Sequence, residues 1–348
     1  MNRLIRRQRI LRGKRSGCFD TNQRYLEEAV RARAARQVRV FLRRNQTVLL
    51  ITPRWSRPDR FLDELAADVG IGSPQVFAHV VPLGVLSGRK VHEVWSFLLR
   101  ALVEVCEVPL ERTAAQPMHR EGFRQVVGEI LDASVGGPMR ALLLYGIEHL
   151  PFEVRSDAYR ALMDHHDRVG SARRVNMLFA GTVAGSNAEF AGARKVVLPD
   201  FGPAESVQAL YEYVSNVEAR DVEIAASMVG GVPALLHAVG MHGETEGEMI
   251  QSQDELWRIL GPLADELRGA VDIVAADDKL AERLEDVARE GTLRVAPKMD
   301  GKLLRAGLLR GVPRASRPRV TVRAPIIAQL AGMALGQGDG AGTEPNAS

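Results

Sequence analysis

Five short runs of apolar residues, separated by segments with helical periodicity, constrain the fold of this chain more than any other feature of its sequence. Strands that are apolar on both faces are typical of parallel sheets, because helices cover both sides of such a sheet. The intervening segments repeat apolar residues every three to four positions, as helices with one buried face do. The sequence therefore predicts an α/β core with a mostly parallel five-stranded sheet and helices on both faces. The predicted strands are residues 47–51, 75–81, 141–145, 175–180 and 195–198.

The order of elements changes near residue 200, and this change divides the chain. Beyond it helices follow one another, and only residues 317–323 alternate apolar and polar side chains as a strand does. Among the expected helices are residues 203–219, 252–268 and 302–310. The predicted parts are a basic flexible arm (1–19), the α/β core (20–200), a helical lid (201–248), a winged-helix-like module (249–335) and a disordered tail (336–348).

The positive charge of the chain is concentrated in two segments. The net formal charge is only +3, but residues 1–44 hold 14 Lys and Arg against 3 acidic residues, and residues 294–323 hold 9 against Asp300 alone. Two basic segments on an acidic body favour localised binding of an anion, and nucleic acid is the commonest anionic partner. Alternatively, the basic segments solvate one face of a helix or dock on the acidic body of the chain itself.

Nothing in the sequence indicates a membrane or an oxidising compartment. No apolar run approaches the roughly 20 residues that are needed to cross a bilayer, and no apolar region follows the basic N-terminus as in a signal peptide. Cys18 and Cys106 are too few for a disulfide framework. We therefore expect a cytoplasmic protein without a membrane partner.

The loop between the first predicted strand and the next helix carries the main functional clue. Its sequence, TPRWSRPD over residues 52–59, resembles the nucleotide-binding segment of AAA+ and STAND-type ATPases, G-P-R-G-S-G-K-T. Thr52, Trp55 and Arg57 stand at the three glycine positions of that segment. Pro58 replaces its lysine, and Asp59 replaces the threonine that holds Mg²⁺.

These replacements remove groups that phosphate binding and hydrolysis need. Trp55 and Arg57 put side chains where the backbone must approach phosphate, and neither adopts a positive φ cheaply. Pro58 lacks both the ammonium group and an N–H donor, and Asp59 adds a negative charge. Hydrolysis by the mechanism of these families is therefore not expected, and neither ATP nor Mg²⁺ is expected as a cofactor. Three arginines leave open that the loop still holds an anion: Arg54, Arg57 and Arg60.

Further segments resemble the same families, in the same order along the chain. Residues 142–150 resemble the second acidic motif, in which Tyr145 replaces the aspartate and Glu148 remains. Residues 176–182 resemble the sensor-1 strand, with Thr182 at its polar position. The strand-to-lid transition, the lid turn and the winged helix are matched by residues 197–205, 230–236, 304–309 and 320–325.

The resemblance covers about residues 20–335 and implies a degenerate P-loop ATPase of the AAA+/STAND type, with core, lid and winged helix. The nucleotide-site residues that it implies are Thr52, Arg54, Arg57, Asp59, Arg60, Glu148 and Thr182.

The second basic segment coincides with the predicted winged helix, which favours nucleic acid as its partner. Trp257 is the only aromatic residue in 250–348, so stacking on single-stranded bases is disfavoured and contact with the backbone of double-stranded DNA is the better interpretation. The candidate nucleic-acid-binding residues are Arg6, Arg7, Arg12, Lys302, Arg305, Arg314, Arg317, Arg319 and Arg323.

Residues 164–167, Asp-His-His-Asp, suggest a metal cluster at first sight. Adjacent residues of a helix point in different directions, however, so these four side chains do not converge on one ion. No other cluster in the sequence has the spacing of a metal site or of a catalytic triad. We therefore predict neither a metal site nor a catalytic residue.

Three functions stay open on the sequence alone. The first is a catalytically inactive AAA+/STAND-like factor with a regulatory or architectural role, which binds nucleic acid through its basic arm and its winged helix. Self-assembly or an active ATPase partner is compatible with this hypothesis. The second is a protein scaffold, or an adaptor for an active ATPase, without DNA binding. The third is a nucleotide-binding switch with an atypical loop.

Overall fold

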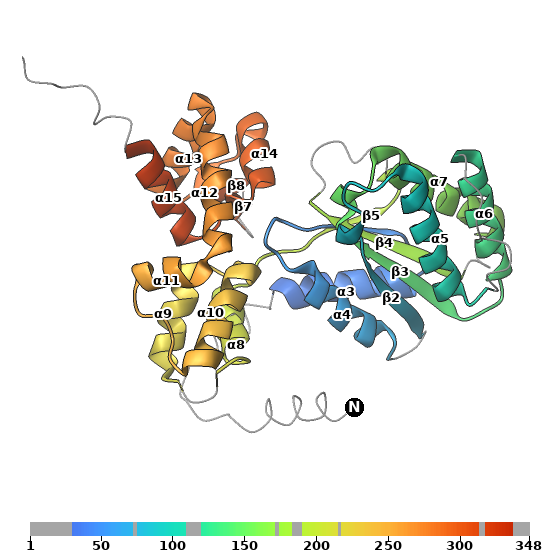
Figure 1. Ribbon diagram of the computed structural model, residues 1–348, viewed down its shortest axis with the longest axis horizontal. Helices are drawn as coiled ribbons and strands as arrows, with labels where there is room; N and C mark the ends of the chain where they lie inside the picture. The colour runs from blue at the N-terminus through green and yellow to red at the C-terminus, as the bar shows by residue number, and fades with distance from the viewer. Residues whose placement is uncertain are drawn as a thin grey trace, which may run out of the picture.

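The structure is a computed structural model that describes residues 30–71, 75–108, 120–170, 174–182, 190–214, 217–312 and 317–336. The predicted arm, residues 1–19, and the predicted tail beyond residue 336 lie outside the described residues. An α/β core forms one side of the molecule, and a helical lid and a C-terminal module are stacked on the other side (Figure 1). No helix of the described residues is long and apolar enough to span a membrane.

The core is built on one parallel sheet. Its strands lie in the order β2-β3-β4-β1-β5, and every neighbouring pair is parallel. The predicted mostly parallel five-stranded sheet is therefore confirmed. The strands are β1 (Val48–Ile51), β2 (Val76–Pro82), β3 (Met139–Tyr145), β4 (Val175–Gly181) and β5 (Arg194–Val197).

Helices cover both faces of this sheet because its central strands are apolar on both faces. Leu49 and Leu50, adjacent on β1, are fully buried in two different cores. The core around Leu50 includes apolar residues of α3 (Val30–Arg43) and α4 (Pro58–Val69). The core around Leu49 includes those of α5 (Val91–Cys106), α6 (Arg120–Ala133) and α7 (Phe152–Val169). The predicted two-sided helical cover is confirmed.

The lid and the C-terminal module share a single hydrophobic core, which runs from Leu210 to Ala331. The lid consists of α8 (Pro203–Leu210), α9 (Ala219–Val229) and α10 (Pro233–Glu246). The helices of the module are α11 (Gln253–Leu260), α12 (Pro262–Ala275), α13 (Asp278–Glu290), α14 (Pro297–Ala306) and α15 (Pro325–Gly336). The segments 201–248 and 249–335, predicted as two parts, therefore bury their apolar faces against each other.

A small antiparallel sheet completes the module. Its strands β6 (Leu293–Arg294), β7 (Leu309–Gly311) and β8 (Arg319–Val322) lie in the order β6-β8-β7. Between β6 and β7, residues 295–308 hold a single helix, α14, where a helix-turn-helix has two, and the winged-helix-like module stays a prediction.

Three expected helices end or begin elsewhere. The helix expected over 203–219 ends at Leu210, and turns follow it. The helix expected over 252–268 is two helices, because Gly261 has a φ of 48° and Pro262 starts a new one. The helix expected over 302–310 lies earlier, at 297–306, and residues 309–311 form β7.

Candidate functional site

The loop that resembles a nucleotide-binding segment, residues 52–57, connects β1 to α4 and has an unusual backbone. Trp55 and Arg57 have φ angles of 60° and 47°, in the left-handed region that favours glycine. Both residues stand at glycine positions of the family pattern. The loop therefore adopts left-handed backbone at two positions without glycine, at a cost of about 1–3 kcal/mol per residue.

Three consecutive carbonyl groups of this loop accept hydrogen bonds from three different parts of the chain. The Arg323 guanidinium donates to the carbonyl of Arg54. The backbone N–H of Ala234, at the start of lid helix α10, donates to the carbonyl of Trp55 at 3.0 Å. Arg31, in the first turn of α3, donates from Nη2 to the carbonyl of Ser56 at 2.7 Å. The loop thus joins the module, the lid and the N-terminal helix, and these contacts hold its strained backbone.

The side chain of Trp55 attaches the loop to the C-terminal module. Its indole Nε1 donates a hydrogen bond to Glu266 Oε2 on α12 at 3.0 Å. The ring also packs against the turn after α14, where a Cβ atom on Gly307 would approach the indole to 2.9 Å. Gly307 has a φ of 82°, so both its conformation and this close contact require glycine. The Arg54 guanidinium lies 5.2 Å from the centre of the indole ring, in cation–π contact.

Arg323 is buried beneath this loop. Its guanidinium makes two hydrogen bonds to the Asp200 carboxylate, of 2.8 and 2.6 Å, and its exposed fraction is 1%. Asp200 belongs to the segment between β5 and the lid, 123 residues away in sequence. The prediction that Arg323 contacts nucleic acid is therefore wrong, because the side chain is enclosed and its charge is paired.

Two of the three arginines expected to hold an anion are paired with carboxylates, whereas Arg54 is exposed and contacts the ring of Trp55. Arg57 bonds to Asp59 at 3.0 Å. Arg60 bonds to Glu64 at 3.2 Å and also to Glu212 of the lid. Burial raises the pKa of Asp59, but the hydrogen bond and charge of Arg57 outweigh it and bring the net pKa below its ordinary value. Asp59 is therefore an anion at neutral pH, at the position where the family has a hydroxyl that binds Mg²⁺.

Two other candidate residues meet at the ends of β3 and β4. Glu148 accepts a hydrogen bond from the backbone N–H of Thr182 at 3.2 Å, so this carboxylate lies at the end of the sensor-1 strand. Burial raises the pKa of Tyr145, and the negative charges of Asp59 and Asp63 raise it further. Thr52 is buried, and its N–H donates to the carbonyl of Gly181 at 2.9 Å. The structure therefore gathers these candidates at the carboxyl ends of β1, β3 and β4.

The sequence patterns did not predict the side chains that hold the loop in place. Arg31 belongs to the basic segment 1–44, for which both binding of an anion and docking on the chain itself stayed open, and its guanidinium faces the loop. Asp200 lies in segment 197–205, which resembles the strand-to-lid transition, but that resemblance does not indicate its pairing with Arg323, and Glu266 belongs to no motif. The only available signal was the isolated tryptophan at a glycine position, which needs somewhere to pack.

The histidines of segment 164–167 have structural partners. His165 Nδ1 lies 2.9 Å from Asp132 Oδ1, and His166 Nε2 lies 3.0 Å from the carbonyl oxygen of Val175. Burial lowers the pKa of His165, which favours the neutral imidazole. Within the described ranges, no three His, Cys, Asp or Glu side chains gather so as to hold a metal ion.

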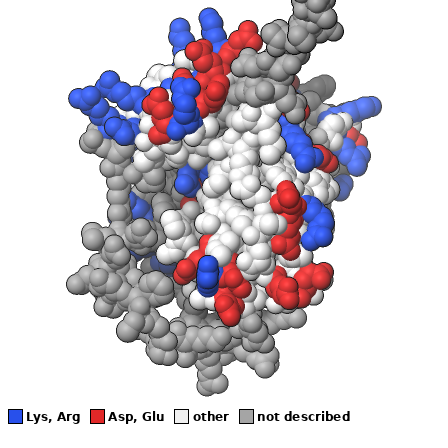
Figure 2. All heavy atoms as spheres, turned by 90° about the vertical axis from the view of Figure 1, so that its left-hand side faces the viewer, with Lys and Arg blue, Asp and Glu red and all other residues white. Residues whose placement is uncertain are grey.

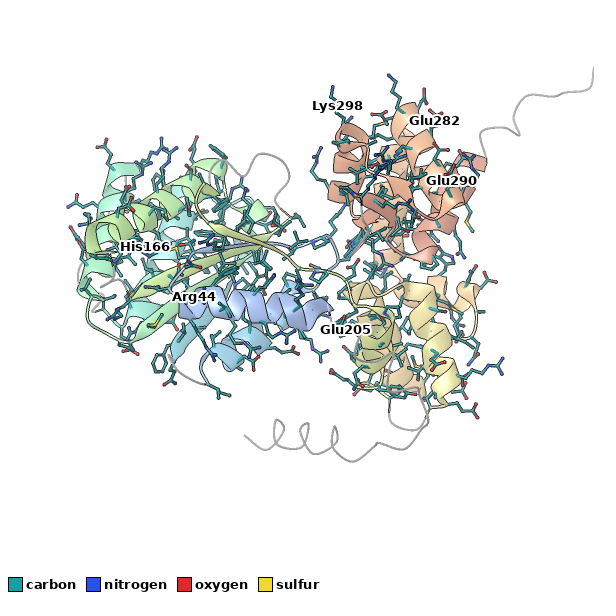
Figure 3. The ribbon with its side chains drawn as sticks, turned by 180° about the vertical axis from the view of Figure 1, so that it is seen from behind. Arg44, His166, Glu205, Glu282, Glu290 and Lys298 are labelled. Carbon is teal, nitrogen blue, oxygen red and sulfur yellow. The ribbon has the colours of Figure 1, made fainter. Side chains whose placement is uncertain are left out.

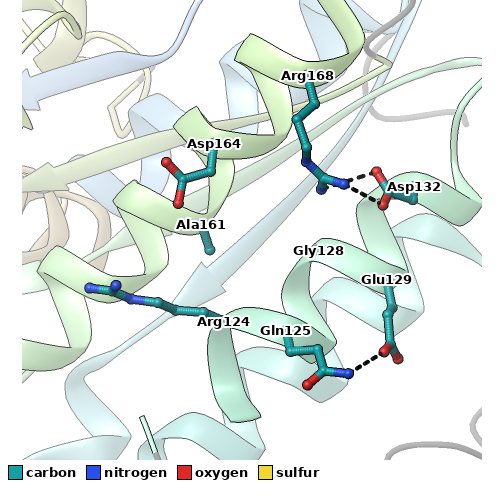
Figure 4. A pocket seen from close by; sticks show the side chains of 8 residues that line it. All are labelled: Arg124, Gln125, Gly128, Glu129, Asp132, Ala161, Asp164 and Arg168. Carbon is teal, nitrogen blue, oxygen red and sulfur yellow. Dashed lines mark hydrogen bonds and ion pairs between the residues drawn. The ribbon is translucent and has the colours of Figure 1, made fainter. Parts of the chain in front are cut away.

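A hollow of about 340 Å³ lies between α6 and α7, and none of its lining residues belongs to the loop (Figure 4). Two of its polar pairs are internal: Arg168 bonds to Asp132 at 3.0 Å, and Gln125 bonds to Glu129 at 3.0 Å. A third lining residue, Arg124, is bonded to Asp157 outside the hollow. Its lining residues are Arg124, Gln125, Gly128, Glu129, Asp132, Ala161, Asp164 and Arg168.

The candidate nucleic-acid residues separate into three groups. Arg6, Arg7, Arg12 and Arg314 lie outside the described residues, and Arg323 is buried. Lys302 is exposed and forms an ion pair of 3.2 Å with Asp277. The remaining candidates are exposed and have no ion pair within the described part of the chain; they are Arg305, Arg317 and Arg319.

Two arginines of the small sheet lie directly opposite each other. Arg294 on β6 pairs with Arg319 on β8 in the antiparallel register, so both side chains project from the same face. Both are exposed, and neither has an ion pair with a described residue. Like charges in this arrangement destabilise a sheet unless an anion lies between them.

The outer face of the lid and module has a different character. Uncharged surface runs through its middle, and charges of both signs lie at its edges (Figure 2). Helix α15, which belongs to this module, contains no charged residue. This face therefore lacks the single-sign charge that attracts a phosphate backbone.

Comparison with known proteins identifies the fold. No family model and no curated protein matches this sequence. Among solved structures, a Walker-type ATPase of Pyrococcus abyssi is similar with a TM-score of 0.57 and 14% identity, over 86% of this chain and 95% of that one. Cdc6p from Pyrobaculum aerophilum is similar with a TM-score of 0.49 and 9% identity, over 88% and 94%.

At this identity the likeness to the Pyrococcus protein establishes the fold alone. Together with the strand order of the sheet, it shows that the chain has the AAA+-type fold of P-loop ATPases. The resemblance inferred from the loop and the later motifs is confirmed at this level.

Proposed function

We propose that this protein uses an AAA+-type fold without nucleotide hydrolysis and binds the phosphate backbone of duplex nucleic acid through its C-terminal module. Its role is then architectural or regulatory. The observation that carries the proposal is the Arg294–Arg319 pair, two exposed like charges held opposite each other on neighbouring strands. A phosphate group between the two guanidinium groups removes their repulsion and accepts hydrogen bonds from both.

Helix α14 adds a basic stripe to the same module. Lys298, Lys302 and Arg305 are exposed and stand at positions i, i+4 and i+7, so they share one face of the helix. Lys298 projects on the side of the module toward the α/β core, whereas Glu290 of α13 lies on the opposite side (Figure 3). An exposed basic stripe on one helix favours contact with the backbone of a duplex.

The lack of hydrolysis is supported by the loop. Pro58 begins helix α4 at the position of the catalytic lysine and supplies neither charge nor donor. The negative Asp59 lies where Mg²⁺ would be held, and the neighbouring cations Arg57 and Arg60 are paired with carboxylates. The carbonyl groups of the loop are engaged by other parts of the chain.

Fluorescence anisotropy with a labelled 30-base-pair duplex tests the nucleic-acid proposal. The unpaired cations Arg294, Lys298, Arg305, Arg317 and Arg319 predict a slope of log K against log salt of about −4.5. Replacing Arg294 and Arg319 by glutamate together should weaken binding at least tenfold and reduce the slope by about 2.

The matched control is Arg220→Glu with Arg258→Glu, two exposed arginines on α9 and α11 that give the same change in net charge. Equal weakening by the control would show that only net charge matters. If the unaltered protein does not bind duplex at 150 mM salt, the scaffold hypothesis replaces this one.

A further inference from the structure

Arg31 is held in a small site of its own at the junction of core and lid. It lies in the first turn of α3, and its backbone N–H donates to Glu205 of α8 at 3.2 Å. Glu205 lies in the lid, close to the N-terminal end of α3 (Figure 3). Burial of the guanidinium lowers the pKa of Arg31 to about 10, against the opposing charges of Asp200 and Glu205. The side chain is therefore half-buried at this junction.

The groups around the Arg31 guanidinium match a flat cation. Nη2 donates to the carbonyl of Ser56 at 2.7 Å, and Nε donates to the carbonyl of Pro199 at 3.2 Å. The guanidinium carbon lies 4.5 Å from the ring centre of Phe201 and 5.8 Å from that of Phe61. No carboxylate of the described residues lies within ion-pair distance of it. Aromatic faces and carbonyl oxygens are the surroundings that select a planar, weakly hydrated cation over an ammonium.

These four partners come from three segments. Ser56 belongs to the loop after β1, and Phe61 belongs to α4. Pro199 and Phe201 belong to the linker that leads from β5 into the lid. One side chain of α3 thus connects the loop, the helix that follows it and the lid linker.

We infer that this junction is a binding site for a planar organic cation of the guanidinium class, and that the protein fills it with its own Arg31. Arg31 acts as an internal ligand that joins the loop after β1 and the lid linker to α3. The site lies apart from the residues proposed to bind duplex, so neither proposal depends on the other.

The full-length Arg31→Ala protein tests this by chemical rescue with methylguanidinium chloride. The substitution removes the internal ligand and leaves the carbonyls of Ser56 and Pro199 without their donors. We expect a Tm several degrees lower and faster amide exchange in α8 and in the linker. Methylguanidinium at 1–20 mM should reverse both changes with saturation, whereas tetramethylammonium chloride, which is neither planar nor a donor, should not.

The unaltered protein is the control, because its site is already filled. Equal effects of methylguanidinium on the unaltered and Arg31→Ala proteins would overturn the inference, as would the absence of rescue in a folded variant.

If Arg31→Ala does not fold, milder changes test the same site. Arg31→Lys keeps the positive charge but replaces the planar guanidinium by a tetrahedral ammonium, and Phe201→Leu removes the aromatic ring. The two changes should not be additive in urea unfolding, because each removes the contact of the planar guanidinium with the Phe201 ring. Additive shifts of the urea midpoint would contradict a site built for a planar cation.

Discussion

Replacing Trp55 by alanine and by glycine separates the strain of the loop backbone from the contacts of the side chain. Both variants lose the indole, which is partly buried against the Gly307 turn, and its hydrogen bond to Glu266. The lost packing is worth about 2 kcal/mol, half of a fully buried tryptophan. The hydrogen bond to an exposed carboxylate adds about 1 kcal/mol. Alanine should therefore lower the free energy of unfolding by about 3 kcal/mol.

Glycine should be the less damaging of the two replacements. At a φ of 60° the left-handed conformation destabilises the folded state of the alanine variant by about 1–2 kcal/mol, and it does not destabilise that of the glycine variant. Glycine loses about 0.5–1 kcal/mol through its freer unfolded chain. The balance predicts that Trp55→Gly is more stable than Trp55→Ala by about 1 kcal/mol, whereas the opposite order is usual elsewhere in proteins.

Urea unfolding followed by far-ultraviolet circular dichroism measures this difference. Val40, a half-exposed position within helix α3, provides the matched control. There, Val40→Gly should be less stable than Val40→Ala by about 1 kcal/mol, because glycine is a poor helix former. If Trp55→Ala equals or exceeds Trp55→Gly in stability, the loop does not hold the left-handed backbone and the account of its strain is refuted.

Two further predictions concern the contacts around the loop. Arg323→Ala leaves the buried carboxylate of Asp200 without its partner and should lower the free energy of unfolding in urea by about 3–5 kcal/mol. The control Arg220→Ala, at an exposed site, should lower it by less than 0.5 kcal/mol. Similar losses for both variants would contradict the buried pair. Burial and the nearby positive charges lower the pKa of His237, so the unfolded chain binds more protons than the folded one just below pH 6.5. Stability should therefore fall as the pH drops below about 6.5, and His237→Gln should flatten that part of the urea-midpoint profile; an unchanged profile would assign the fall to other groups.

The core of the fold could be predicted from the sequence because its pattern is local. The run from Val48 to Ile51 is apolar at every position, and only a strand covered on both faces buries such a run. The break at Gly261 was missed although Gly-Pro is a turn signal, because the apolar period continues across it from α11 to α12.

The site was only partly predictable because its contacts are long-range. Arg323 lies four residues after Arg319 in a predicted strand, so the alternation of side chains predicts that both arginines lie on the same exposed face. Its burial depends on Asp200, which lies 123 residues earlier in the chain. Likewise, Arg31 looks like any other arginine of a basic helix until the loop and the linker are folded against it. Sequence spacing does not report such partners.

Thermal unfolding in the presence of Mg²⁺-ATP and Mg²⁺-ADP tests most directly the claim that this P-loop fold works without nucleotide. A site with a dissociation constant of 10 µM would stabilise the protein by about 2.7 kcal/mol at 1 mM ligand, which gives a clear rise in Tm. We expect no change in Tm with either nucleotide, because Pro58 and Asp59 replace the groups that bind phosphate and Mg²⁺. A saturable rise that Arg57→Ala removes would contradict the account and identify the protein as a nucleotide-dependent switch.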